Sequence, residues 1–127
     1  MPDSLTDLQH ARTTHAADRV SSWSGGSKSR LCKKVLGLPV LVRTMGAAPA
    51  VAMLNKGDTR SLAEDLAGWL VFHCPATPLG GSQARSGVAD FIREFCKLDQ
   101  SAAHAVDEEA LRFAESLKLM SIAIHGT

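Results

Sequence analysis

The chain has 127 residues, of which 45% are hydrophobic and 21% charged, and its formal net charge is +1. This length and composition predict one domain with a buried core, over residues 1–127, and exclude a disordered chain of low hydrophobicity and high charge. No apolar run approaches the roughly 18 residues that span a bilayer, and the first residues lack the basic and apolar stretches of an export signal, so we expect a cytoplasmic protein.

The pattern of apolar residues is helical almost throughout, because no run alternates strictly in the way that a half-buried strand does. The first helix is expected from Ser4, its N-cap, to about Trp23, where Ser-Gly-Gly-Ser interrupts the pattern. The second begins near Lys28, and one stripe of its surface is apolar: Leu31, Val35, Leu38 and Val42. Pro39 interrupts this stripe, so we expect a kink there or a helix that begins afresh.

Gly46 is expected to end this helix, and a short Ala-rich helix follows over residues 47–56. The next helix begins with a capping box formed by Ser61 and Glu64, after which apolar residues recur at helical spacing. Glycine, proline and serine are frequent in residues 74–87, which are therefore predicted to form a loop.

The last helix is the clearest in the sequence. Asp107 is its expected N-cap, preceded by a turn or two over residues 101–106 and by an amphipathic helix over residues 88–98. Its expected core stripe comprises Ala110, Phe113, Ala114, Leu117, Met120 and Ile124. Together these segments predict an all-α bundle of about six helices.

Three apolar residues of this last helix point away from its core stripe: Leu111, Leu119 and Ile122. On a single free chain they would form exposed apolar surface, which is typical of a contact with another chain. A bundle that buries the helix on two sides explains the same residues equally well. A subunit interface and a second buried face are therefore both open interpretations.

No arrangement of side chains in the sequence predicts catalysis, a metal site or a cofactor site. No two of the five histidines are spaced to share a helix face, and the three cysteines form no C-x-x-C pair. The Gly-Gly loop at residues 80–81 lacks the lysine of a phosphate-binding P-loop. We expect neither an enzyme nor a bound cofactor.

Charge is distributed unevenly along the chain. Residues 8–60 carry nine basic and two acidic residues, whereas residues 61–127 carry five basic and nine acidic residues. Arg30, Lys33 and Lys34 fall at i, i+3 and i+4, so they share one face of a helix, and such a face is suited to phosphate oxygens. Aromatic residues are scarce nearby, which favours contact with a nucleic-acid backbone, RNA or DNA, over base readout. The same basic residues are equally typical of a solvated helix face. The candidate nucleic-acid-binding residues, which become RNA-binding candidates with the resemblance below, are Arg30, Lys33, Lys34, Arg43, Lys56 and Arg60.

The segment from Arg30 to Leu54 resembles a known pattern of basic residues, an apolar stretch with a proline, a basic residue with a polar neighbour, a glycine, and an Ala-rich helix. Here these are Lys33, Lys34, Pro39, Arg43-Thr44, Gly46 and Met53-Leu54. Two further segments resemble the family that has this pattern, and they follow in the same order along the chain: residues 62–70, which end in Trp69-Leu70, and residues 109–124. That family is the small subunit of type III-B CRISPR effector complexes (Cmr complexes).

The resemblance implies an all-α, non-catalytic protein. Copies of the small subunit stack along the inner side of a filament, beside repeated backbone subunits that carry out RNA cleavage, and help to hold the guide RNA–target RNA duplex. The expected partners are therefore other subunits, further copies of the chain itself, and both RNA backbones, with no membrane. The alternative is a helical interaction module whose basic face binds an acidic protein partner and no RNA.

Overall fold

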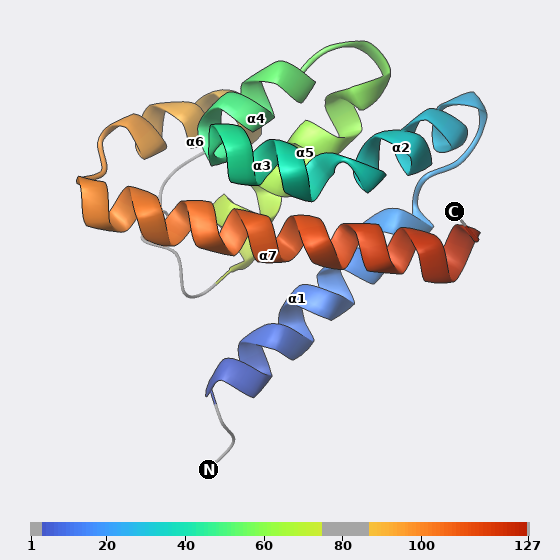
Figure 1. Cartoon of the computed structure of the whole chain (residues 1–127), viewed down its shortest axis with the longest axis horizontal. Helices are drawn as coiled ribbons and strands as arrows, with labels where there is room; N and C mark the ends of the chain where they lie inside the picture. Colours follow the sequence, from blue (N-terminus) through green and yellow to red (C-terminus); the bar gives the residue numbers. More distant parts are fainter. Residues whose placement is uncertain (1–3, 75–86, 127) are drawn as a thin grey trace.

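Figure 1 shows the fold, a computed structural model that describes residues 4–74 and 87–126, without the side chains of residues 4–6, 72 and 73. Within these residues there are seven α-helices and no strand, so the all-α prediction is confirmed. The helices are α1 (Ser4–Ser21), α2 (Gly26–Leu36), α3 (Leu38–Met45), α4 (Ala47–Leu54), α5 (Arg60–Gly68), α6 (Gly87–Cys96) and α7 (Gln100–His125). A 3-10 turn, η1 (Gly57–Thr59), lies between α4 and α5, and a π-helical turn, η2 (Trp69–His73), follows α5.

Helix α7 organises the bundle. It has 26 residues, which corresponds to about 39 Å of helix, and it crosses the whole molecule in Figure 1. Helices α2, α3 and α4 follow one another along α7, whereas α1 crosses it obliquely and its N-terminal end projects beyond the other helices. The helices of the first half of the chain therefore lie around one long helix, which carries four acidic and two basic residues.

The core is apolar and centred on aromatic rings. The rings of Trp69 and Phe113 stack with their centroids 5.1 Å apart, and His15 from α1 stacks on Trp69 at 5.4 Å. The largest fully buried side chains are Trp69, Phe91, Phe113, Leu38, Leu54, Leu62, Leu66, Leu70 and Leu117. Burial of one such side chain stabilises the fold by about 1.5–3 kcal/mol, so this cluster fixes how the helices pack.

The break between α2 and α3 confirms the helix expected to begin afresh near Pro39. α2 ends at Leu36 and Gly37 separates it from α3, in which Pro39 occupies the first turn, where its missing N–H has no intrahelical partner to lose. Gly46 ends α3 as predicted. Its φ of +86° and ψ of 170° lie in a region that glycine alone occupies readily, and the chain changes direction there into α4.

Two predicted N-caps are wrong, and both errors move a helix start toward the N-terminus. α7 begins at Gln100 and is capped by Asp99, whose carboxylate accepts from the N–H of Ala102 at 2.8 Å. Residues 101–106 are therefore part of α7. Asp107 lies inside α7, where it accepts instead from the N–H of Ala47 at 2.8 Å and caps α4 from outside.

The capping box is the second error. α5 begins at Arg60 after Thr59, so Ser61 lies inside the helix and cannot cap it. Ile124, expected in the core stripe of the last helix, is 45% exposed. The expected loop lies outside the described residues from 75 to 86, as does the capping side chain expected at Ser4.

Candidate nucleic-acid interface

Helix α2 presents two faces of opposite character. Its buried face comprises Leu31, Cys32 and Val35. Arg30, Lys33 and Lys34 lie beside that face and are exposed, as the helical period requires. The two lysines occupy the last turn of α2, where the negative end of the helix dipole stabilises cations.

The turn after α4 brings a fourth cation to this face. Lys56 precedes η1, and Gly57 has a left-handed φ of +52°, which lets the chain reverse at this point. The hydroxyl of Thr59 closes the turn by donating to the backbone oxygen of Leu54 at 2.8 Å. Helix α2 packs against η1, and between them lies a shallow depression of about 540 Å³. We call it the basic depression; it is lined by Arg30, Lys33, Lys34, Lys56, Gly57, Asp58 and Thr59.

The cations of the basic depression differ in their pairing. Arg30 forms an ion pair with Asp58, and both side chains are accessible to solvent. Across residues 4–74 and 87–126, no carboxylate pairs with Lys33, Lys34 or Lys56. Three unpaired ammonium groups therefore remain available to an anionic ligand.

The sequence-predicted site is only partly brought together. Four of its six residues line the basic depression. Arg43, in the last turn of α3, and Arg60, at the start of α5, are exposed but do not line it. Asp58 was not predicted at all, because it follows Arg30 by 28 positions and helical periodicity relates only near neighbours in sequence.

Two further cations of the basic first half, Arg12 and Arg19, form ion pairs elsewhere in the fold and do not line the basic depression. Arg12 donates two hydrogen bonds to Glu109, and both residues are buried. Arg19 donates to the buried carboxylate of Asp65 at 2.7 Å. The hydrogen bond to Glu109 raises the pKa of Arg12, and the hydrogen bond to Asp65 raises that of Arg19, so both guanidinium groups stay charged and paired.

The carboxylates of these pairs also accept from tryptophans. The indole N–H of Trp69 donates to Glu109 at 2.9 Å, and that of Trp23 donates to Asp65 at 3.3 Å. Burial raises the pKa of Asp65, against the opposing effect of the hydrogen bonds from Arg19 and Trp23. These networks hold α1 on the bundle and serve structure rather than ligand binding.

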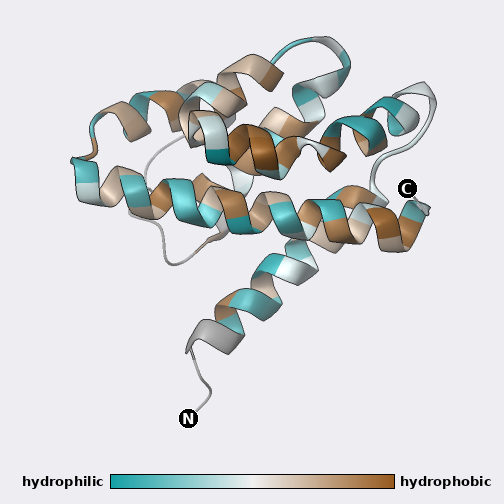
Figure 2. Ribbon diagram, in the orientation of Figure 1, coloured by the Kyte–Doolittle hydropathy of each residue, from teal (hydrophilic) through white to brown (hydrophobic). Residues whose placement is uncertain are grey.

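Exposed large apolar side chains occur in two stretches of the chain, one on α2–α4 and one at the C-terminal end of α7. Figure 2 shows α3 and the C-terminal end of α7 as largely hydrophobic stretches of ribbon. The first group comprises Leu36, Val40, Met45 and Met53, and the second Leu119, Ile122 and Ile124. Of the two open interpretations, exposed apolar surface fits Leu119, which is 60% exposed, and Ile122, which is 42% exposed. The second buried face fits Leu111, which is half-buried and packs against the core.

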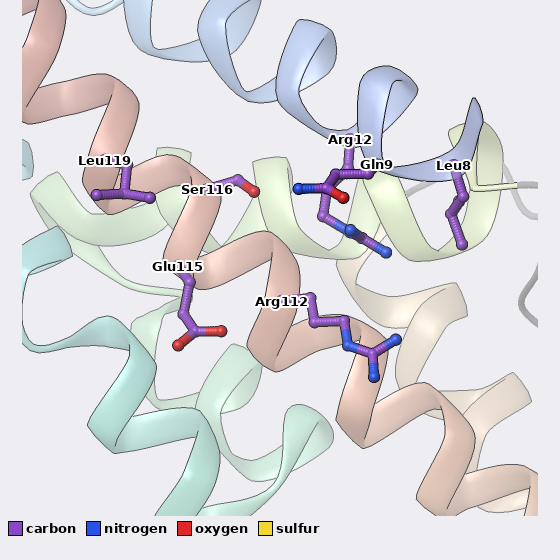
Figure 3. Close-up of a pocket in the computed structure, with 7 residues that line it drawn as sticks. All are labelled: Leu8, Gln9, Arg12, Arg112, Glu115, Ser116 and Leu119. Atoms are coloured by element: carbon purple, nitrogen blue, oxygen red, sulfur yellow. The ribbon is translucent and has the colours of Figure 1, made fainter. Parts of the chain in front are cut away.

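A groove of about 550 Å³ lies between α1 and α7, beside their contact (Figure 3). Leu8, Gln9 and Arg12 line it from α1, and Arg112, Glu115, Ser116 and Leu119 from α7. Arg12 is held by Glu109, and both Arg112 and Glu115 are exposed, so the groove carries charges of both signs. Such a lining favours neither a polyanion nor a wholly apolar ligand.

The described part of the chain contains no cluster of three or more histidine, cysteine, aspartate or glutamate side chains that could hold a metal ion. Nor does any of its helices have the length and apolar character needed to cross a membrane. The arrangement of α2 and η1 is therefore the strongest candidate for a ligand-binding surface.

Comparison with known families identifies the chain. The family model described as CRISPR-associated protein (Cas_Cmr5) matches residues 8–124, which is nearly the whole sequence. The chain belongs to this family. The Cmr5 family is the small, all-helical, non-catalytic subunit of type III-B Cmr complexes, so the chain is a subunit of that CRISPR effector and associates with other Cmr subunits. No curated protein and no solved structure gives a significant match to it.

Proposed function

We propose that this Cmr5-family chain stacks with further copies of itself in the inner filament of the effector and contacts the backbones of guide and target RNA without catalysis. The observation that supports RNA contact is the convergence of Lys33, Lys34 and Lys56 on one depression, with no carboxylate partner among the described residues. Lysine side chains with free ammonium groups are suited to phosphate oxygens.

The mode of contact follows from what lines the basic depression. Its lining holds four cations and no aromatic ring. Trp23, the nearest tryptophan in sequence, is 5% exposed and donates its N–H to Asp65, so it is not available to stack on a base. Binding should therefore depend on phosphates and be independent of sequence.

The stacking of copies is supported by the exposed apolar side chains, which belong to two groups on different elements. One group lies on α2–α4 and the other on the C-terminal end of α7, and a head-to-tail arrangement needs two different contact surfaces. Leu119 and Ile122 are the proposed interface residues, and Leu111 joins them only through its exposed half. Leu119→Asp with Ile122→Asp should reduce the number of copies per complex without unfolding the free chain. An unchanged copy number would contradict the stacking surface.

The RNA contact is tested in the assembled complex. Lys33→Glu with Lys34→Glu reverses two charges in the basic depression. Arg93→Glu with Lys97→Glu reverses two charges at the C-terminal end of α6 and in the turn directly after it, where both side chains are exposed and each pairs with a residue three positions away. We expect the first variant to release target RNA faster than wild type and the second to behave as wild type. Equal retention by all three proteins would contradict the proposal.

The same variants separate RNA from the alternative ligand, an acidic protein surface. Both ligands carry negative charge, so each would be lost from Lys33→Glu with Lys34→Glu. If the variant leaves RNA retention unchanged but no longer joins the complex, the basic depression binds a protein subunit instead. Complex composition and bound RNA are therefore measured on the same preparation.

A further inference from the structure

We infer that Asp58 competes with RNA phosphates for Arg30. The two side chains are paired in the free subunit, and they separate when RNA binds. This inference rests on the proposed function of the basic depression. Asp58 is the one carboxylate in a lining that otherwise offers four cations. It lies on η1, and Arg30 lies on the facing helix α2, so the ion pair spans the depression from one wall to the other.

Asp58 has no evident structural task. No residue of η1 is buried. The turn is already closed by the hydroxyl of Thr59, which donates to the backbone oxygens of Leu54 and Lys56. The side chains of Arg30 and Asp58 are 71% and 41% exposed, and a pair this exposed contributes little to folding.

The exposure of the pair also makes it exchangeable. A weak ion pair that is exposed to water can exchange partners readily. A phosphate group can accept two hydrogen bonds from the guanidinium of Arg30, as a carboxylate does, so it can replace Asp58 as the partner. While Asp58 remains, its charge also repels a phosphate placed beside Lys33 or Lys34. Asp58 thus lowers the affinity of the basic depression for RNA and removes one cation from it in the free state.

Asp58→Asn tests the inference in the full chain, with a fluorescently labelled single-stranded oligouridine as the probe and anisotropy as the readout. Asp7→Asn is the matched control, because it removes the same charge from an exposed residue in the first turn of α1, at the end of the molecule away from α2. Asp58→Ser is a second neutral variant, and circular dichroism reports whether each variant is folded.

At low salt we expect Asp58→Asn to bind about two- to fivefold more tightly than wild type. The slope of log affinity against log salt should steepen by up to about 0.7, because in wild type the carboxylate that releases Arg30 takes up a cation and offsets one counterion released from the single strand. Asp7→Asn should match wild type. Arg30→Gln should cost more affinity in the Asp58→Asn background than in wild type, because only there is Arg30 free in the absence of RNA.

Two results would overturn the inference: equal binding by Asp58→Asn and Asp7→Asn, or an equal cost of Arg30→Gln in both backgrounds. Failure of the proposed function looks different, since Lys33→Glu with Lys34→Glu would then bind the probe as well as wild type. If that double variant binds weakly while Asp58→Asn matches its control, the RNA site stands and only the role of Asp58 is wrong.

Discussion

Arg12 and Glu109, 97 positions apart in the chain, form a buried ion pair through two hydrogen bonds, with Nε 2.6 Å from Oε2 and Nη2 2.8 Å from Oε1. The indole N–H of Trp69 donates to the same carboxylate. The network joins α1 to α7 and to η2. A similar arrangement follows seven residues later on α1, where Arg19 pairs with Asp65. Because charges in a core must be paired, these contacts fix the position of α1 along the bundle.

Removal of Arg12 should therefore be severe. Arg12→Met leaves Glu109 as an unpaired buried charge and should lower the free energy of unfolding by about 3–5 kcal/mol, measured by denaturant titration. Arg12→Met with Glu109→Gln should cost less than the single substitution, because no unpaired charge remains and the amide oxygen still accepts from Trp69. Arg112→Met, on the exposed side of α7, is the control and should change stability little. A double variant less stable than Arg12→Met would contradict this explanation.

The junction of α3 and α4 gives a second prediction. Gly46 has a φ of +86° and a ψ of 170°, and a Cβ added there would lie 3.4 Å from a carboxylate oxygen of Asp107. Gly46→Ala should therefore cost about 1–3 kcal/mol of unfolding free energy. Gly26→Ala, at the start of α2, meets no atom within 4 Å and should be neutral or slightly stabilising. Equal effects of the two substitutions would show that backbone conformation at Gly46 carries no cost.

Asp107 is tested at the same junction by removal of its carboxylate. Asp107→Ala leaves the N–H of Ala47 without its partner and should cost about 1 kcal/mol. Asp107→Asn keeps an acceptor and should cost less. If thermal unfolding shows both variants as stable as wild type, the cap from α7 to α4 contributes nothing.

The buried Asp65 predicts a pH dependence of stability. Since burial raises its pKa, the folded chain binds a proton at Asp65 more tightly than the unfolded chain does. Its contribution to stability is then greatest below the ordinary aspartate pKa of about 3.9 and falls as pH rises to the folded-state pKa. The difference in unfolding free energy between wild type and Asp65→Asn should follow this fall. A difference that grows with pH would mean that the hydrogen bond from Arg19 outweighs burial.

Local patterns in the sequence predicted much of the fold. The apolar stripe of α2, the break near Pro39 and the end of α3 at Gly46 depend on residues within a few positions of one another, so periodicity and backbone chemistry suffice. The same period placed Arg30, Lys33 and Lys34 on one exposed face.

Contacts between distant segments could not be predicted in this way. Asp107 has the chemistry of an N-cap, and it does cap a helix, but the helix is α4, 60 positions earlier. Glu109 lies two positions after Asp107, the expected N-cap, yet it is the buried partner of Arg12. Charge counts along the chain therefore overstated the free positive charge of the first half, because they could not show which cations pair with carboxylates of distant segments.

The central claim is that Lys33 and Lys34 contact RNA phosphates, and the salt dependence of target-RNA binding by the assembled complex tests it most directly. For a single-stranded target, each phosphate contact contributes about −0.7 to the slope of log affinity against log salt. Lys33→Glu with Lys34→Glu should flatten that slope by about 1.4 relative to wild type and to Arg93→Glu with Lys97→Glu. An identical slope and affinity in all three complexes would contradict the claim.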